Sequence, residues 1–395
     1  CAYGSAEPSL SEAVRFALDP ASPARGCLSD TLFVVLGGTS AAGPVRTLLA
    51  MGASVACLAR KGSKLKDLVQ LAESTPGTLL VPVPACDLPR EIDTVSKRPP
   101  SEDEIRRQSE EYRATVGEKA GADLLTQLPE VIAWIKQLPG SDDDRSRGKR
   151  LVLGNYIYLD GEKHVRATMA MDTIVASVCS TFPDTALAYL GSPSIAYSIP
   201  LEAAAASNAT YDRPGLGLHR LNPFRIGWDR NMRRPVVSGD GRQTQVMNGL
   251  ASFQGPNYAL AKTLQHYRAY VMRASGTTVS ASFAPPMRTD SMLHVPAVKT
   301  FLDGLEAFPP NIALPPETCA PVMTAVLLYD LTAKESSANP EVRLGHVMDL
   351  MHGAALHGGS WRCAYAGKSI EKSIFLAGKT FGGRAACHDA VVKKK

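Results

Sequence analysis

The sequence predicts an α/β protein built on a doubly wound parallel sheet, with helices on both faces of the sheet and long insertions. Two observations support this fold class. Short apolar runs alternate with helix-like segments over residues 31–335, and a glycine-rich turn follows the first of these runs. A continuous apolar run is typical of a strand that is buried on both faces of a parallel sheet.

Composition limits the classes of function. The 395 residues are 45% hydrophobic and 21% charged, which is typical of a globular protein with a sizeable core. The formal net charge of +5 is spread along the chain, apart from arginines in 230–234 and the tail 393–395. We therefore predict no nucleic-acid partner. No run of about 20 apolar residues is present, so no membrane span is predicted.

The cysteines and the first residue bear on the compartment. Eight cysteines are scattered without a Cys-x-x-Cys pair, which favours a reducing compartment over a disulfide framework or a zinc site. His352 and His357 lie in a glycine-rich stretch without a nearby carboxylate, so no metal site is predicted there. The chain begins with Cys1 rather than methionine. A removed targeting peptide, and hence a plastid or mitochondrion, fits this start.

The first strands and the turn between them form the best-defined unit. Residues 1–30 are interpreted as an N-terminal arm with a helical pattern over 10–18. A strand over 32–36, a glycine-rich turn over 37–43, a helix over 44–51 and a strand over 52–60 then follow. The start of that helix could receive a pyrophosphate, and the alternative is a purely structural turn. The turn residues predicted to bind the cofactor are Gly37, Gly38, Thr39, Ser40 and Gly43.

The ends of the second and third strands suggest which nucleotide is bound. Arg60 ends the second strand, where an arginine fits the 2′-phosphate of NADP(H) and an acidic residue would select NAD(H). An ordinary surface arginine is the alternative interpretation. A helix over 64–72 leads to a third strand over 79–83, after which Asp87 could meet the adenine.

The later segments continue the alternation of strands and helices. Residues 89–119 are predicted to be a solvated polar excursion, and residues 195–252 show no regular period, so we interpret them as a lid or a partner-binding insertion. Residues 336–395 are predicted to be a C-terminal extension with a basic tail. The remaining predicted elements are helices over 122–138, 165–179 and 315–331, and strands over 151–155, 185–190 and 277–283. Asn155 ends one of these strands, and Ser192 and Ser194 follow another.

A helix that begins near residue 258 holds the main catalytic candidates. Tyr258 and Lys262 are four residues apart, so they lie on one face of that helix. The lysine charge is expected to lower the tyrosine pKa from about 10 and to make its hydroxyl a proton donor near neutral pH. A tyrosine and a lysine on a helix surface are the alternative, because this spacing is frequent by chance.

The order of these motifs resembles the short-chain dehydrogenase/reductase family over roughly residues 30–330. The resemblance implies a Rossmann fold, a proton-donating Tyr258 and a ribose-binding Lys262. It also implies that Ser192 or Ser194 binds the substrate carbonyl and that Asn155 lines the cofactor channel. The segment 285–289, Pro-Pro-Met-Arg-Thr, is similar to the loop that covers the nicotinamide in this family, which makes Thr289 a candidate cofactor contact.

The sequence also departs from the family pattern. The usual serine position, about a dozen residues before the tyrosine, holds Gln245 or Val246, with Thr244 beside them. Ser192 or Ser194 can serve only if 195–252 loops out, so we expect one of them within about 5 Å of Tyr258 Oη. The third glycine of the turn is missing, and Asp172 stands in the helix where the family often has a relay asparagine.

The sequence leaves two functions open. The first is an NADP(H)-dependent reductase, with NAD(H) as the other possible cofactor, that acts on a small-molecule or acyl carbonyl substrate. The second is a non-catalytic subunit of a larger assembly that keeps the nucleotide-binding fold. Either protein could also form a homo-oligomer.

Overall fold

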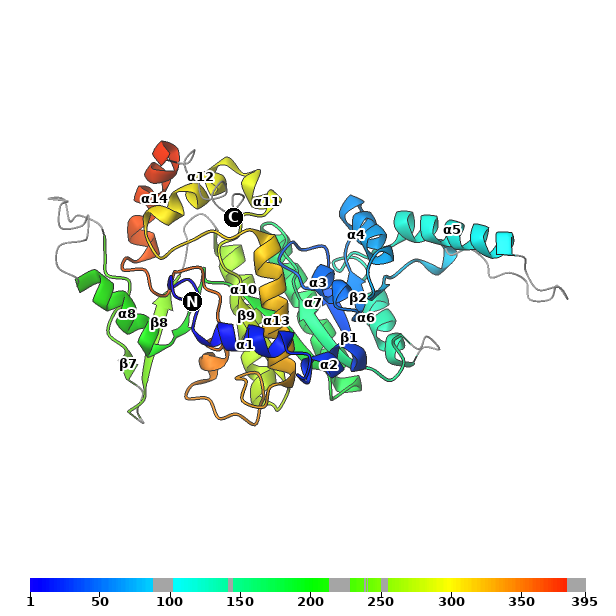
Figure 1. Cartoon of the computed structure of the whole chain (residues 1–395), viewed down its shortest axis with the longest axis horizontal. Helices are drawn as coiled ribbons and strands as arrows, with labels where there is room; N and C mark the ends of the chain where they lie inside the picture. The colour runs from blue at the N-terminus through cyan, green and yellow to red at the C-terminus, as the bar shows by residue number, and fades with distance from the viewer. Residues whose placement is uncertain are drawn as a thin grey trace. The chain divides into compact units, whose positions relative to one another are not determined.

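The computed structural model describes residues 1–87, 102–140, 145–212, 228–237, 239, 241–249 and 255–381. The chain forms two compact units. Unit 1 comprises Cys1–Ala24 and Tyr189–Lys395, and unit 2 comprises Arg25–Ala188. Figure 1 labels most of the helices and several of the strands of both units. The division into an arm, a central domain and a C-terminal extension stays a prediction.

A six-stranded sheet has the order β3-β2-β1-β4-β5-β9. Its strands are β1 (Thr31–Leu36), β2 (Ser54–Leu58), β3 (Thr78–Leu80), β4 (Arg150–Asn155), β5 (Ala186–Gly191) and β9 (Val279–Phe283). β2 pairs in parallel with β1 and β3, and β1 pairs in parallel with β4. Every side chain of β1 is buried, as expected for a central strand. The predicted α/β class with a doubly wound, Rossmann-like sheet is confirmed.

The register of this sheet aligns the strand ends that carry the candidate cofactor residues. Leu36 at the end of β1 lies opposite both Leu58 of β2 and Asn155 of β4. The turn after β1, the residues after β2 and the last residue of β4 therefore lie at one edge of the sheet. In open α/β sheets, the carboxyl ends of the strands are where ligands bind.

The helices of unit 2 agree with the sequence in three places and differ in two. Those that agree are the short α3 (Val45–Ala50), α4 (Ser63–Glu73) and α7 (Glu162–Thr181), and the one-turn η1 (Ala85–Asp87), which was not predicted, contains Asp87. The predicted helix over 122–138 was too long, because α6 is only Leu128–Gln137 and ends in η2 (Leu138–Gly140). Residues 120–122 instead bond to the sheet edge, where Ala122 N–H donates to Ala59 O at 2.9 Å.

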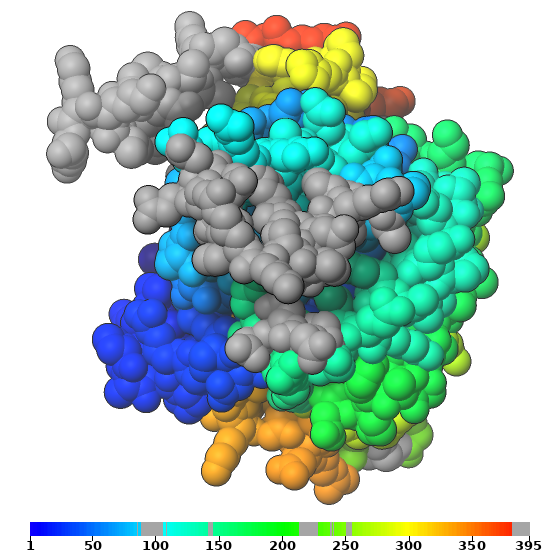
Figure 2. Space-filling view, turned by 90° about the vertical axis from the view of Figure 1, so that its right-hand side faces the viewer, coloured from blue at the N-terminus to red at the C-terminus, as the bar shows by residue number. Residues whose placement is uncertain are grey.

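The second difference in unit 2 is a long helix within the predicted polar excursion. α5 (Glu102–Lys119) forms there and packs against α4, while residues 88–101 lie outside the described residues. Most of its described side chains are exposed, as expected for a solvated segment, although no helix was predicted here. Figure 2, which views the right-hand side of Figure 1, shows the cyan side chains of α5 at the surface. A short α2 (Ala24–Asp30) precedes β1.

Four helices of unit 1 form two packed pairs, and the candidate catalytic helix α10 (Gly255–Ala274) contacts β9 and η4 (Val347–Met351). α1 (Ser9–Leu18) packs against α13 (Pro316–Thr332), and Figure 1 shows the two helices crossing. α12 (Pro296–Gly304) lies along α14 (Gly367–Phe381), and a Cβ on Gly304 would be 1.9 Å from Ile374 O. A side chain there would therefore separate the two helices. Short helices α11 (Asp290–Leu293), η3 (Leu305–Ala307) and η4 complete this part.

The described part of the insertion over 195–252 contains regular elements, although the sequence there shows no regular period. It contains β6 (Ala196–Ile199), α8 (Leu201–Asp212), β7 (Val236–Val237) and β8 (Gln243–Asn248). The strands form an antiparallel sheet in the order β6-β8-β7, in which β6 and β8 are joined by more than 40 residues of chain. Because these strands pair across such a long stretch of chain, no short-range hydrophobic repeat in the sequence indicates the sheet.

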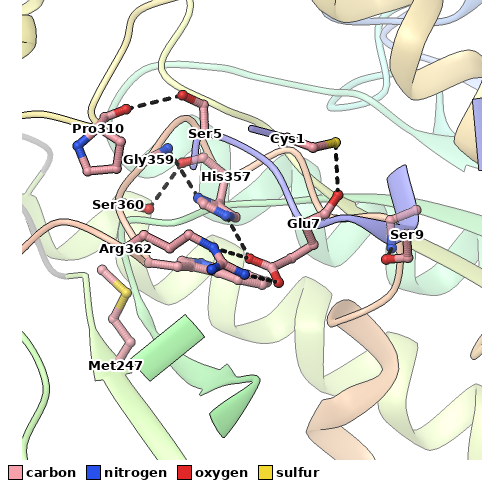
Figure 3. Close-up of polar contacts among 12 residues, drawn as sticks. Cys1, Ser5, Glu7, Ser9, Met247, Pro310, His357, Gly359, Ser360 and Arg362 are labelled. Atoms are coloured by element: carbon pink, nitrogen blue, oxygen red, sulfur yellow. Dashed lines mark hydrogen bonds and ion pairs between the residues drawn. The ribbon is translucent and has the colours of Figure 1, made fainter. Parts of the chain in front are cut away.

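The N-terminal segment is anchored in unit 1 by a buried carboxylate. Glu7, only 6% exposed, accepts bonds from Arg362 at 3.1 and 2.8 Å and lies 3.1 Å from His357 Nε2. Figure 3 shows this cluster together with the bond from Ser5 to Pro310 O. Burial would raise the pKa of Glu7, but the bonds from His357 and Arg362 outweigh it and lower the pKa. The ring of His357 stacks on Trp361, which is fully buried core.

Candidate functional site

The turn after β1 is held by bonds to the neighbouring strand. Gly37 has φ +79°, and the N–H groups of Gly37 and Gly38 donate to Leu58 O at 2.8 and 3.1 Å. Ser40 N–H then donates to Gly37 O, and Gly43 N–H donates to Ser40 O. These bonds form a tight turn directly ahead of α3.

Two glycines of this turn have no room for a side chain. A Cβ on Gly37 would lie 2.8 Å from the backbone of Ile157, and one on Gly38 would lie 2.3 Å from Cys57 Sγ. The missing third glycine is explained by Val45, whose buried side chain occupies the first turn of α3. The candidate Thr39 is half-buried.

A cavity of about 480 Å³ opens beside the ends of β2 and β3 in unit 2. Its lining includes the predicted Arg60 and Asp87. The other lining residues, which were not predicted from the sequence, are Lys61, Pro84, Lys119, Gly121, Ala122, Asp123 and Gln127. Lys119 Nζ is 3.6 Å from Asp87 Oδ1, whereas Arg60 and Lys61 are exposed. Three cations and the carboxylates of Asp87 and Asp123 line the cavity, and the exposed Arg60 and Lys61 are the groups that could bind a phosphate.

Asn155 offers a hydrogen-bond donor at the end of β4. The side chain is 1% exposed, and its Oδ1 accepts the N–H of Ile157 at 3.2 Å. Its Nδ2 has no hydrogen-bond partner among the residues that the structure describes. A buried donor of this kind costs about 1–3 kcal/mol unless a ligand or water accepts it. The predicted cofactor role of Asn155 is compatible with this orphaned donor.

In unit 1, the structure brings together two residues that the sequence separates by 66 positions. Tyr258, in the first turn of α10, donates from Oη to Ser192 Oγ at 3.0 Å. The expectation that a serine after β5 lies within about 5 Å of Tyr258 Oη is therefore confirmed for Ser192. Thr244 and Gln245 instead pair with Val236 and Ile199 in the inserted sheet. Residue 252 lies outside the described part of the chain.

The hydrogen bonds of Ser192 leave its own proton available. Ser194 N–H also donates to Ser192 Oγ, at 3.1 Å. A hydroxyl has two acceptor lone pairs and one donor, and both acceptor positions are used here. The O–H of Ser192 is thus the group that can bind a carbonyl oxygen. Ser194 contributes its backbone to this arrangement.

Lys262 lies on the same face of α10 and is 7% exposed. Its Nζ donates to Leu190 O and to Gln265 Oε1, each at 3.0 Å. Because an ammonium has three N–H donors, one remains for a ligand. Burial lowers the pKa of Lys262 to about 8, so the side chain is still mostly charged at neutral pH.

The expected lowering of the Tyr258 pKa is wrong for this structure. Burial raises the pKa of Tyr258, and the hydrogen bond to Ser192 opposes that shift only in part. The sequence places Lys262 one turn away but cannot show that Leu190 and Gln265 bind its ammonium group. Tyr258 therefore keeps its proton at neutral pH.

His266, four residues after Lys262 and 3% exposed, was not predicted from the sequence. The backbone N–H of Ser192 donates to His266 Nε2 at 3.3 Å. Burial, followed by the nearby charge of Lys262, lowers the pKa of His266 to about 3, so the ring is neutral. Tyr258, Lys262 and His266 are spaced four residues apart, which places them on one face of the helix. No sequence motif indicates a functional histidine at this position.

The remaining candidates have other contacts. Thr289 caps α11 by accepting the N–H of Met292, so its predicted contact with a cofactor stays a prediction. His352 Nε2 lies 2.9 Å from Ser198 Oγ. Within the described ranges, no group of three or more His, Cys, Asp or Glu side chains could hold a metal ion. No helix in this part of the chain is long and apolar enough to cross a bilayer.

The sequence matches no protein-family model, and no curated protein matches it. Among solved structures, it is similar to a short-chain type dehydrogenase/reductase from Mycobacterium ulcerans, with 14% identity over 90% of this chain and 96% of that one, and a TM-score of 0.44. A 3-oxoacyl-[acyl-carrier protein] reductase from Brucella melitensis gives 10% identity, 85% and 98% coverage and a TM-score of 0.43. The RhlG/NADP active-site complex of Pseudomonas aeruginosa is 14% identical over 85% of this chain and 97% of that one, with a TM-score of 0.39.

The class of protein is defined by the chain's own topology. The sheet order and the strand–turn–helix unit after β1 make it an α/β protein with a Rossmann-like sheet, into which an antiparallel sheet is inserted.

Proposed function

We propose that this protein is an NADP(H)-dependent oxidoreductase that reduces a carbonyl group, with Tyr258 as the proton donor. The observation that carries the proposal is the 3.0 Å contact between Tyr258 Oη and Ser192 Oγ, with Lys262 on the next turn of α10. A phenol and a hydroxyl that share a hydrogen bond can both reach one substrate oxygen.

The protein side of the reaction follows from these contacts. Ser192 has one unused O–H, which donates to the carbonyl oxygen and orients it. Tyr258 holds a proton at neutral pH and transfers it to that oxygen as negative charge develops. The charge of Lys262 stabilises the phenolate that remains. A bound nicotinamide would supply the hydride.

The residues present fit a dinucleotide. In unit 2, Asn155 Nδ2 is a donor that a ligand can use. The turn over 37–43 comes close to the neighbouring backbone, as a phosphate-binding turn does. The cavity lined by Arg60, Lys61 and Lys119 favours NADP(H) over NAD(H), because its cations suit a 2′-phosphate.

The finer proposal is an extended, acyl or lipid-like substrate. It is supported by the inserted sheet, where Val236, Val237 and Val246 are 57%, 61% and 39% exposed. Exposed apolar side chains gathered on one small sheet are a favourable surface for an apolar ligand or partner.

The test is a binding and turnover comparison. NADPH and NADH binding are measured by fluorescence, and NADPH oxidation is followed with a panel of ketones, aldehydes and β-ketoacyl thioesters. Tyr258→Phe should reduce turnover about 10²–10⁴-fold while leaving NADPH affinity nearly unchanged. Tyr267→Phe is the matched control, because Tyr267 is on the same helix but 66% exposed. Loss of turnover in both variants, or in neither, would contradict the assignment.

A non-catalytic subunit of a larger assembly is the second candidate. It is favoured by the internal bonds of Lys262, because an ammonium that binds Leu190 O and Gln265 also serves to fix α10 against β5. In that case no carbonyl in the panel is reduced, and Tyr258→Phe changes only stability. Deletion of the inserted sheet would then release the partner.

A further inference from the structure

A buried histidine beside the serine has no role in the reaction described above. His266 is the only ionisable group shown to bond the backbone of Ser192 in the described part of the chain. Its ring packs edge-on against Phe283 and Tyr270, with centroids 6.0 and 6.2 Å away. Rings on these sides limit how far the imidazole can turn.

The hydrogen bond defines which ring nitrogen carries the proton. Since Ser192 N–H donates to Nε2, this nitrogen must be unprotonated. A neutral imidazole then carries its proton on Nδ1, which is buried and has no partner among the described residues. The opposite tautomer would point Nε2–H at the Ser192 N–H and leave both donors unsatisfied.

The same ring also sets the position of the chain before the serine. A Cβ on Gly191 would lie 3.1 Å from His266 Nε2 and 3.3 Å from Ser282 O. The end of β5 is therefore pressed against the imidazole, and the next residue, Ser192, is tied to it by its N–H. The Oγ held in this way is the one that Tyr258 contacts.

We propose that His266 is a positioning residue for the reaction: as a neutral Nδ1–H imidazole, it holds the backbone of Ser192 so that the serine hydroxyl stays against Tyr258. This inference rests on the proposed function and assigns a new residue to it. His266 binds the backbone N–H of Ser192, whereas Tyr258 binds its hydroxyl, so His266 acts through Ser192.

The orphaned Nδ1–H distinguishes this role from simple packing. A buried donor without an acceptor lowers stability, so an apolar ring would serve a purely structural purpose better. His266→Phe removes that orphaned donor and creates another at Ser192 N–H, so the two effects offset. We expect the thermal midpoint to change by no more than about 3 °C.

Activity should respond differently. Displacing the serine hydroxyl in His266→Phe should lower kcat about 10–100-fold, with NADPH affinity unchanged. His266→Gln should recover most of this loss, because its side-chain oxygen reaches the place of Nε2. His266→Asn has the same amide on a shorter stem and should not recover it. Equal activity of the Gln and Asn variants, or a wild-type kcat in the Phe variant, would overturn the proposal.

A spectroscopic measurement tests the inference without turnover. Nitrogen chemical shifts of ¹⁵N-histidine-labelled protein at neutral pH report the tautomer, and the His266→Gln spectrum identifies the signal. The expected result is a neutral ring with protonated Nδ1 and unprotonated Nε2. A protonated Nε2, or a charged ring, would overturn the proposal even in an active enzyme. If the tautomer is as expected and no carbonyl is reduced, the proposed function fails while the His266–Ser192 bond stands.

Discussion

The turn assigned to the cofactor allows a sharp test of the packing beneath it. Gly38→Ala places a Cβ 2.3 Å from Cys57 Sγ, whereas non-bonded heavy atoms are optimally about 3.5–4.0 Å apart. Cys57 is fully buried in β2, so its sulfur has no open space to enter. We expect a loss of about 2–3 kcal/mol in the free energy of unfolding, near the upper end for overpacking.

A double-mutant cycle identifies the cause. Cys57→Ala alone should cost about 1 kcal/mol for the lost sulfur contacts. In the double variant the atoms nearest to the new Cβ are the Cβ of residue 57, at 3.3 Å, and Val35 O, at 3.4 Å, so most of the clash is removed and the two changes should compensate. We expect a coupling energy of about 1–2 kcal/mol in favour of the double variant.

Unfolding in urea, followed by circular dichroism, measures all three variants. Gly26→Ala is the control, because a Cβ on Gly26 meets nothing within 4 Å and the residue lies in α2. This change should be neutral or stabilising by up to about 1 kcal/mol. A Gly38→Ala variant as stable as the wild type, or a double variant no more stable than Gly38→Ala, would refute the proposed clash with Cys57.

Two further predictions concern charged groups. Glu7→Gln should lower the free energy of unfolding by about 2–3 kcal/mol in thermal or urea unfolding, because Arg362 and His357 lose a buried carboxylate. The pKa of Glu7 is lowered on folding, so this contribution is present above about pH 4.3 and should be lost as the pH falls below it; an unchanged acid limb in the variant would contradict this. In turnover, the pKa of about 8 for Lys262 predicts that kcat/KM falls as the pH rises through about 8, since the neutral amine no longer stabilises a phenolate. Lys262→Arg should remove this limb from the pH–rate profile, and a limb that persists near pH 8 would assign it to another group.

The sequence was most informative where local patterns decide the structure. The apolar run over 32–36 is a strand buried on both faces, and Pro44 directly precedes α3, so β1, the turn and α3 could be predicted together. The resemblance in motif order predicted that Ser192 or Ser194 lies near Tyr258, and the structure selects Ser192.

Long-range pairing and backbone bonding explain what the sequence did not show. β8 buries Gln245 and exposes Val246, so its hydrophobic pattern does not follow its burial. The strand is recognisable only through its pairing with β6. The segment 120–127 has helix-forming residues, yet Gly121 at φ +124° and its bond to Pro82 O hold it at the sheet edge. Pro129 was the better signal for the start of α6.

The electrostatics of the site depend on burial, which spacing does not reveal. Residues at i and i+4 share a helix face, but the direction of the Lys262 ammonium depends on Leu190 O, a backbone atom 72 residues away. The same holds for His266, whose bond to Ser192 spans 74 residues. The i, i+4 spacing therefore identified Tyr258 and Lys262 as candidates, but it could not predict that the pKa of Tyr258 is raised.

Reduction of a carbonyl by Ser192, Tyr258 and Lys262 with a nicotinamide cofactor can be tested directly. The measurement is label transfer from NADPH carrying deuterium at both C4 positions, with each carbonyl of the panel, read by mass spectrometry of the product. We expect one deuterium on the former carbonyl carbon with the wild type and Tyr267→Phe. Labelling with Tyr258→Phe should be at least a hundredfold slower, about the lower limit for losing a general acid. Bound NADPH without label transfer to any carbonyl, or equal labelling by Tyr258→Phe, would contradict the proposed reaction.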